Sequence, residues 1–279
     1  MILGAHVSTA GGIQNSVDNA EEIGCTSFQV FTKNQRQWIA PPLREEDVSA
    51  FRERLGSSGL GPVLSHGSYL MNLSNPKPTV FERSKKAVID ELERCHLLDI
   101  PYFVMHPGSH LGRGVKAGVE RMVQGMDDIF FSFDGPQIIL LETTAGQGTN
   151  LGSRFEHLIR IIEGCSFPER LGICFDTCHT YTAGYNIRSR GSYEETMEEF
   201  GSVIGMGRLK AVHLNDTEMK LGSGKDRHAS IGQGEIGTEG FSNLVNDRKL
   251  KDIPGILETP GGPEGYRKDL NVLRGLSAG

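Results

Sequence analysis

The 279-residue chain lacks the features that would place it in a membrane or in a secretory pathway. No apolar run approaches the roughly 18 residues that a membrane-spanning helix needs. The first residues, MILGAHVSTAGG, lack the basic and apolar regions of a secretory signal. These absences exclude a helical membrane protein and predict that the chain has no membrane partner.

The chain also lacks an excess of basic residues. The chain has 29 Lys and Arg against 35 Asp and Glu, which gives a formal net charge of −6. This balance argues against a broad cationic surface for nucleic acid. It does not exclude nucleic acid as a partner, because bound cations are missing from that sum.

The cysteines show no pairing pattern. They are five in number, an odd count, and no two form a CxxC pair: Cys25, Cys95, Cys165, Cys174 and Cys178. Disulfides are therefore not expected, and we expect the protein in a reducing cytoplasm.

Short apolar runs recur about once every 36 residues, close to the length of one βα unit. The runs are residues 2–6, 27–31, 62–66, 102–106, 138–142, 172–176, 210–215 and 255–258. Their continuous apolar pattern is typical of strands that are buried on both faces of a parallel sheet. Between them, residues 45–56, 79–98 and 192–205 have the apolar spacing of amphipathic helices. No segment resembles a linker, so we predict one α/β domain over residues 1–279, a TIM (β/α)8 barrel.

Side chains that can bind metal stand at the ends of these runs and in two of the following loops. They are His66, His106, Glu142, Asp176, His179, His213, Asp226, His228 and Glu258. The carboxyl ends of the strands carry the active site in TIM barrels, so these residues should meet at one rim. Imidazole together with carboxylate favours zinc. Nine ligands are too many for one tetrahedral ion, so we predict a cluster of two or three ions.

Structural roles compete with this interpretation for single residues. A carboxylate at a strand end, such as Glu142 or Asp176, often caps the following helix. Cys174 and Cys178 flank Asp176 and could act as soft ligands or as a redox pair, although simple packing is favoured. His6 and His110 are candidates for contacts to the ligands or to substrate.

Several longer motifs resemble those of bacterial endonuclease IV, the zinc-dependent family of apurinic/apyrimidinic (AP) endonucleases. They are FTKNQRQW (31–38), HGSYLMNL (66–73), HPGSH (106–110), LLETTAGQG (140–148), FDTCHTYTAGY (175–185), HLNDTEMKLGSGKDRHASIGQGEIG (213–237) and ETPGG (258–262). The resemblance runs in order from residue 2 to about residue 270. Thr217 departs from it, because serine is expected there in many relatives.

The resemblance implies a TIM barrel that holds three zinc ions, with manganese able to occupy one site. His66 and His106 would bind the first ion, and Glu142 would bridge it to the second. Asp176, His213 and Glu258 would complete the second site. The third would be formed by His179, Asp226 and His228.

The resemblance also implies hydrolysis of the phosphodiester on the 5′ side of an abasic site in double-stranded DNA. The products would be a 3′-hydroxyl and a 5′-deoxyribose phosphate, and blocked 3′ ends would be removed as well. Glu258 and Glu142 would be catalytic, with Glu258 orienting the attacking water or accepting its proton. The DNA-binding residues would be Lys33, Asn34, Arg36, Gln37, Tyr69 and Leu70, with Arg113 in the loop after the fourth predicted strand. The enzyme would act on the nucleoid in the cytoplasm and need no obligate protein partner.

Three other functions remain as alternatives. A metal-dependent sugar isomerase of related barrel type would also carry His and carboxylates at its strand ends, but it needs only two ions. An amidohydrolase usually has HxH on its first strand, where this chain has His6-Val7-Ser8. A non-catalytic protein that binds damaged DNA would hold structural zinc, which favours closed, cysteine-rich sites.

Overall fold

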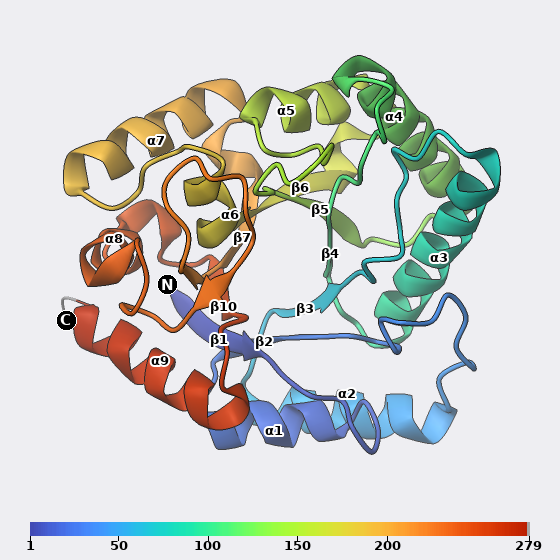
Figure 1. Cartoon of the computed structure of the whole chain (residues 1–279). Coiled ribbons are helices and arrows are strands. Elements are labelled where there is room, and N and C mark those ends of the chain that lie inside the picture. The colour runs from blue at the N-terminus through green and yellow to red at the C-terminus, as the bar shows by residue number, and fades with distance from the viewer. Residues whose placement is uncertain (278–279) are drawn as a thin grey trace.

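The computed structural model describes residues 1–277, and the last two residues of the predicted domain lie outside the described part. Eight parallel strands form a closed barrel in the order β1-β10-β7-β6-β5-β4-β3-β2 (Figure 1). They are β1 (Ile2–His6), β2 (Ser27–Val30), β3 (Val63–His66), β4 (Tyr102–Met105), β5 (Ile138–Glu142), β6 (Leu171–Asp176), β7 (Leu209–His213) and β10 (Pro254–Leu257). The predicted fold class and all eight predicted strands are confirmed.

All helices except α6, which lies inside the ring next to β6, form a ring around this barrel (Figure 1). They are α1 (Asn15–Ile23), α2 (Glu45–Ser58), α3 (Pro78–Leu97), α4 (Val115–Ser132), α5 (Phe155–Gly164), α6 (Thr177–Thr182), α7 (Arg190–Val203), α8 (Gly237–Val245) and α9 (Gly262–Leu276). Short 3-10 turns lie at Pro168–Arg170, Met206–Arg208 and Arg248–Leu250. No helix within residues 1–277 is long and apolar enough to cross a membrane.

Two details differ from the sequence-based prediction. Helix α2 continues two residues beyond the predicted end, because its left-handed cap is Gly59, with φ 73°, and not Gly56. A short antiparallel pair, β8 (Asp216–Thr217) and β9 (His228–Ala229), was not predicted. This pair places His228 opposite Thr217 and so closes the loop that follows β7.

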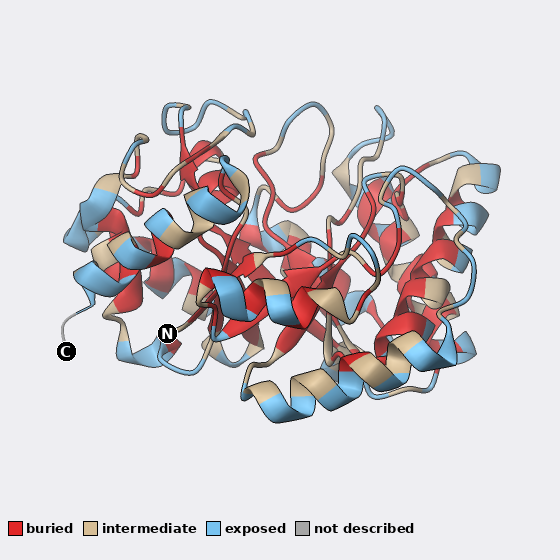
Figure 2. Ribbon diagram, turned by 90° about the horizontal axis from the view of Figure 1, so that it is seen from below, coloured by how far each residue is buried: buried red, intermediate tan, exposed pale blue. Residues whose placement is uncertain are grey.

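Apolar side chains pack both around the barrel and inside it. The helices of the outer ring bury the face that packs on the barrel, as α5 does with Phe155, Leu158 and Ile161. Figure 2 shows the buried strands at the centre and exposed loops at one end of the barrel. A second cluster lies inside the barrel and consists of Leu64, Val104, Leu140, Cys174, Ala211 and Ile256, all fully buried. Each of them stands two residues before a predicted ligand, and residues two apart on a strand point the same way, so the ligands also face inward.

Candidate metal centre

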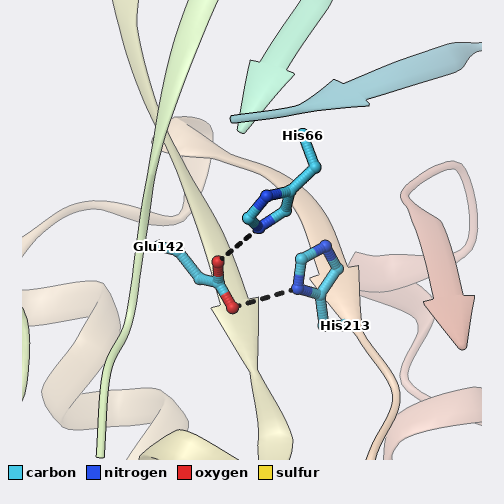
Figure 3. Close-up of side chains that lie close together, drawn as sticks. All are labelled: His66, Glu142 and His213. Carbon is cyan, nitrogen blue, oxygen red and sulfur yellow. Dashed lines mark hydrogen bonds and ion pairs between the residues drawn. The ribbon is translucent and has the colours of Figure 1, made fainter. Parts of the chain in front are cut away.

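Glu142 lies at the centre of the predicted ligands, at the end of β5. Its Oε2 is 3.1 Å from Nε2 of both His66 and His106. Its Oε1 is 3.1 Å from Nδ1 of His213 and 3.2 Å from Nδ1 of His179. Figure 3 shows His66 and His213 on opposite oxygens of this carboxylate. One carboxylate therefore joins side chains from β3, β7 and α6 and from the residue that directly follows β4.

His213 joins Glu142 to a second group of carboxylates. Its Nδ1 lies 3.7 Å from Oδ2 of Asp176 and 3.4 Å from Oε2 of Glu258. The ligand atoms of these four residues all lie within 4.8 Å of one another. Three of the four come from the ends of adjacent strands, β5, β6 and β7, and Glu258 directly follows β10.

A third group forms where the loop after β7 meets α6. Nε2 of His179 lies 3.1 Å from Oδ2 of Asp226, and Nε2 of His228 lies 3.2 Å from Oδ1 of the same residue. The β8–β9 pair holds this loop over the barrel end. All nine predicted residues thus converge on one rim.

The donor set and its spacing fit zinc. Zinc bonds of 2.0–2.2 Å separate tetrahedral ligand atoms by about 3.3–3.6 Å, and the separations here are 3.1–3.7 Å. Nε2 of His228 is buried and has no hydrogen-bond partner within the described residues, although a carboxylate oxygen lies close by. A ring nitrogen that lacks a hydrogen-bond partner and faces a carboxylate oxygen is the arrangement that a shared cation satisfies.

The second nitrogen of four imidazoles is held by a hydrogen-bond partner. Nδ1 of His66 lies 2.8 Å from the carbonyl oxygen of Gly67, and Nδ1 of His179 lies 2.9 Å from that of Thr143. Nδ1 of His228 lies 3.1 Å from the carbonyl oxygen of Glu258. Such partners fix the tautomer and leave the other nitrogen free to bind metal. Nε2 of His213 is held in the same way, by a glutamine side chain.

That glutamine is Gln29, which the sequence analysis missed. Its Oε1 lies 2.9 Å from Nε2 of His213, and its Nε2 donates to Oε1 of Glu258 at 2.7 Å. Gln29 is fully buried on β2, level with His6 on β1. The available signal was a polar residue inside an apolar run, two residues after Ser27.

Asn215 is a second missed residue and also connects two ligands. Its Nδ2 donates to Oδ2 of Asp176 at 2.8 Å, and its Oδ1 accepts from the backbone N–H of Glu258 at 2.9 Å. The motif HLND contains it, directly after β7. Side chains of this kind orient ligands and restrict their motion.

Charge coupling dominates the protonation of the site in the absence of ions. Burial raises the pKa of Glu142, but His106 and His213 outweigh it and hold this pKa well below its usual range. Burial lowers the pKa of His179, yet Asp176 and Asp226 raise it well above the usual value. His179 therefore carries a proton at a position where a cation would bind, and metal must displace it.

The structural alternatives have mixed outcomes. Asp176 does cap α6, since its Oδ1 accepts from the backbone N–H of His179 at 2.7 Å, while its other oxygen faces the site. Cys174 belongs to the apolar cluster inside the barrel, so the packing interpretation is confirmed for it. Burial raises the pKa of the Cys178 thiol to about 12. That thiol lies within 4.8 Å of ligand atoms of Asp176 and His228, so its role stays a prediction.

His6 and His110 separate clearly. Nδ1 of His6 lies 3.3 Å from Oε1 of Glu258, so His6 belongs to the surroundings of the ligands. Nδ1 of His110 accepts from the backbone N–H of Gly114 and stabilises the turn after β4.

The predicted DNA-binding residues lie in two loops at the same end of the barrel. Asn34, Arg36 and Gln37 are exposed in the loop after β2, and Tyr69 is 71% exposed in the loop after β3, next to half-buried Leu70. Lys33 departs from the prediction. Its side chain is only 1% exposed and forms ion pairs with Asp90 and Glu91 of α3, so its ammonium group does not face solvent.

The comparisons with known proteins agree with this geometry. The sequence profile of the xylose isomerase-like TIM barrel family matches residues 17–276. The probable endonuclease 4 of Chloroflexus aurantiacus is 48% identical over 279 residues, covering 99% of this chain and 98% of that protein. The crystal structure of endonuclease IV from Thermus thermophilus superposes with a TM-score of 0.87 at 35% identity, covering 99% of this chain and 98% of the other.

A protein that shares only the fold gives a weaker match. The D-tagatose 3-epimerase-like protein superposes with a TM-score of 0.76 over 99% of this chain and 97% of its own, but only 20% of residues are identical, so the likeness concerns the fold alone. The endonuclease proteins match in sequence as well as in fold over nearly their whole length. The chain therefore belongs to the endonuclease IV family of xylose isomerase-like TIM barrels.

Proposed function

We propose that the protein hydrolyses the phosphodiester on the 5′ side of abasic sites in double-stranded DNA. The products are a 3′-hydroxyl and a 5′-deoxyribose phosphate, and the same site removes blocked 3′ ends. The convergence of nine His, Asp and Glu side chains on one rim carries this proposal, in a chain that is 48% identical to an endonuclease 4.

The proposal includes three zinc ions, with manganese able to occupy one site. His66, His106 and Glu142 would hold the first, and Glu142, Asp176, His213 and Glu258 the second. The third would be held by His179, Asp226 and His228. Bound zinc lowers the pKa of water and offsets negative charge on a phosphodiester during hydrolysis.

Of the three carboxylates around His213, Glu258 is the best placed to take a proton from the attacking water. Its side chain is 20% exposed, whereas those of Glu142 and Asp176 are 1% and fully buried. Burial raises the pKa of Glu258, but His213 and His6 hold it far below its usual range. Glu258 is therefore ionised at neutral pH and can accept a proton, while Glu142 bridges and orients its neighbours.

The loops around the rim would bind the damaged duplex. Arg36, Tyr69 and Leu70 would enter the minor groove and fill the space that the displaced abasic sugar leaves, with Asn34 and Gln37 beside them. Unstacking costs least where a base is already missing, which favours damaged over intact DNA. The five buried, free cysteines suit a reducing compartment, so we place this activity in the cytoplasm, on the nucleoid and without an obligate protein partner.

A cleavage assay on a defined lesion tests the proposal. The zinc content of the purified protein is measured by mass spectrometry, and the protein is then incubated with a duplex that carries one tetrahydrofuran abasic analogue. We expect about three zinc ions per chain, by the ligand count of the site, and a single nick 5′ to the analogue. The same duplex without the lesion is the control. A metal-loaded protein that leaves the lesion strand intact would favour the isomerase or the binding protein.

A further inference from the structure

A buried cluster of charges lies beneath the loop that joins β2 to α2, residues 31–44. Thr32 donates a hydrogen bond to Oε2 of Glu91 at the start of this loop. The next residue, Lys33, forms an ion pair with Asp90, lies 3.5 Å from Oε1 of Glu91 and donates to the carbonyl oxygen of Ala87 at 3.4 Å. Asp90 and Glu91 belong to α3, so the first part of the loop is tied to that helix.

The far part of the same loop is tied to the same helix. Arg94 of α3 donates from Nη2 to the carbonyl oxygens of Ala40 and Pro41 at 3.3 and 2.6 Å. Its Nε donates to both oxygens of Asp90 at 3.2 Å. Asp90 therefore joins Lys33 at one end of the loop to Arg94 at the other. Figure 1 shows the loop passing along the α3 side of the barrel.

Between these two ties, the loop is held by its neighbours and presents its polar side chains outward. Ser68 donates to the carbonyl oxygen of Gln35, and the guanidinium of Arg83 lies 4.5 Å above the ring of Trp38. Arg36 is exposed, and its backbone N–H donates to Oδ1 of Asn34 at 2.9 Å. The loop is thus fastened on its inner side and free on its outer side.

The charges in this cluster are balanced. Two cations, Lys33 and Arg94, face two carboxylates, Asp90 and Glu91, and Glu91 is 2% exposed. Burial raises the pKa of Glu91, and the ammonium group of Lys33 counteracts that shift. A buried carboxylate that lost this partner would be strongly destabilised. The charge of Lys33 is therefore used inside the protein and is not available to a phosphate.

We propose that Lys33 is a positioning residue: with Arg94 it fixes the β2–α2 loop on the carboxylates of α3, so that Arg36 is presented to DNA in a preset position. This inference rests on the proposed function for its DNA partner. A loop that is already ordered avoids the entropy cost of ordering on binding. The proposal also predicts that acidic residues on α3 assist the binding of DNA, although DNA is a polyanion.

The salt dependence of DNA binding separates positioning from a phosphate contact. Lys33→Met and Arg36→Met each remove one cation from the same loop. Each variant is made in a Glu258→Gln background, so that the DNA is not cut. The affinity of the zinc-loaded protein for the lesion duplex is then measured at several salt concentrations. Loss of a cation that lies against the DNA and neutralises its charge lowers the slope of log K against log salt by about one. We expect that loss for Arg36→Met. For Lys33→Met we expect an unchanged slope and a DNA affinity that is weaker by about tenfold, because Arg36 would be slightly misplaced.

Glu91→Gln gives opposite signs for the two roles. If Lys33 contacted phosphate, removing the carboxylate that neutralises it would tighten DNA binding. The clamp that Lys33 and Arg94 form with the α3 carboxylates predicts weaker DNA binding by Glu91→Gln, even though this variant removes a negative charge. Glu93→Gln, at an exposed position of the same helix, is the matched control and should leave binding unchanged.

Trp38 reports on the loop without any DNA, because it is the single tryptophan of the chain. We expect acrylamide to quench the fluorescence of Trp38 more strongly in Lys33→Met and in Glu91→Gln than in the wild-type protein. Zinc content and the unfolding midpoint are measured in parallel. Unchanged quenching in both variants overturns the clamp, as does a lower salt slope for Lys33→Met or tighter DNA binding by Glu91→Gln. If the wild-type protein fails to bind lesion DNA, the proposed function fails, and Trp38 still decides whether the clamp exists.

Discussion

Two neighbouring layers of side chains fill the barrel, and the same six strands supply both. The lower layer is apolar and consists of Leu64, Val104, Leu140, Cys174, Ala211 and Ile256. The upper layer lies two residues further along each strand and consists of His66, His106, Glu142, Asp176, His213 and Glu258. The lower layer stabilises the fold by burial. The upper layer brings carboxylates together with imidazoles in groups that could hold a metal ion, so one step along the strands separates stability from chemistry.

The largest expected effect tests the chemical layer at Glu258. Glu258→Gln keeps the shape of the side chain but cannot accept a proton at neutral pH. We expect cleavage of lesion DNA to fall by about 10²–10⁴-fold, while the affinity for the duplex changes little. Single-turnover nicking and equilibrium binding measure the two quantities. The exposed Glu264→Gln in α9 is the control, and a Glu258→Gln protein that still cuts at the wild-type rate would remove this residue from the mechanism.

The apolar layer should respond in the reverse manner. Leu140→Ala leaves a cavity directly below Glu142, and we expect the free energy of unfolding to fall by about 2–5 kcal/mol. Zinc content per folded chain should stay at the wild-type level. Denaturant unfolding with a chelator present measures the first quantity, and mass spectrometry the second. Ile256→Val, a smaller truncation in the same layer, should cost about 0.5–1.5 kcal/mol; loss of zinc without loss of stability in Leu140→Ala would contradict the division between layers.

A weaker effect is expected at the side chain that holds the chemical layer in place. Gln29→Leu preserves volume but removes the hydrogen bonds to His213 and Glu258. We expect zinc affinity or the cleavage rate to fall by about 10–100-fold. Ser27→Ala, lower on the same strand, removes only a bond to the carbonyl oxygen of Pro62 and should leave both unchanged. Equal behaviour of the two variants would show that Gln29 only packs.

The smallest effect concerns pH in the zinc-free protein. Burial lowers the pKa of His228, but Asp226 raises it to about 9, above the ordinary 6.5. Because the pKa of His228 is raised in the folded state, its protonated side chain stabilises the fold fully below pH 6.5. This stabilisation is lost as the pH rises through about 9. Unfolding with a chelator across this range should show falling stability. Zinc uptake near neutral pH should also release protons, which calorimetry in two buffers detects; a stability that rises with pH would contradict the assignment.

The eight strands and the six candidate ligands at the strand ends could be predicted because each has a local signal. A buried parallel strand is a short apolar run, and a His or carboxylate at its end stands out against that run. Gln29 was missed because the apolar run 27–31 includes Phe31, which appeared to end the strand. In the structure the strand ends at Val30, and Gln29 pairs with His6 at the rim.

The position of Lys33 could not be predicted for a different reason. Its local context is a polar loop that resembles a DNA-binding motif, and there a lysine is expected to face solvent. Its carboxylate partner Asp90 lies 57 residues away in the chain, on helix α3. Only the packing of that helix beneath the loop decides that the ammonium group turns inward.

The sequence by itself determined which layer of each strand is apolar and which is charged, because alternation along an extended backbone places residues two apart on the same side. The tertiary structure decided which distant charges meet. Closure of the barrel brings together carboxylates and imidazoles from strands far apart in the chain. Burial then makes each unpaired charge costly, so that every charge at the rim requires a partner.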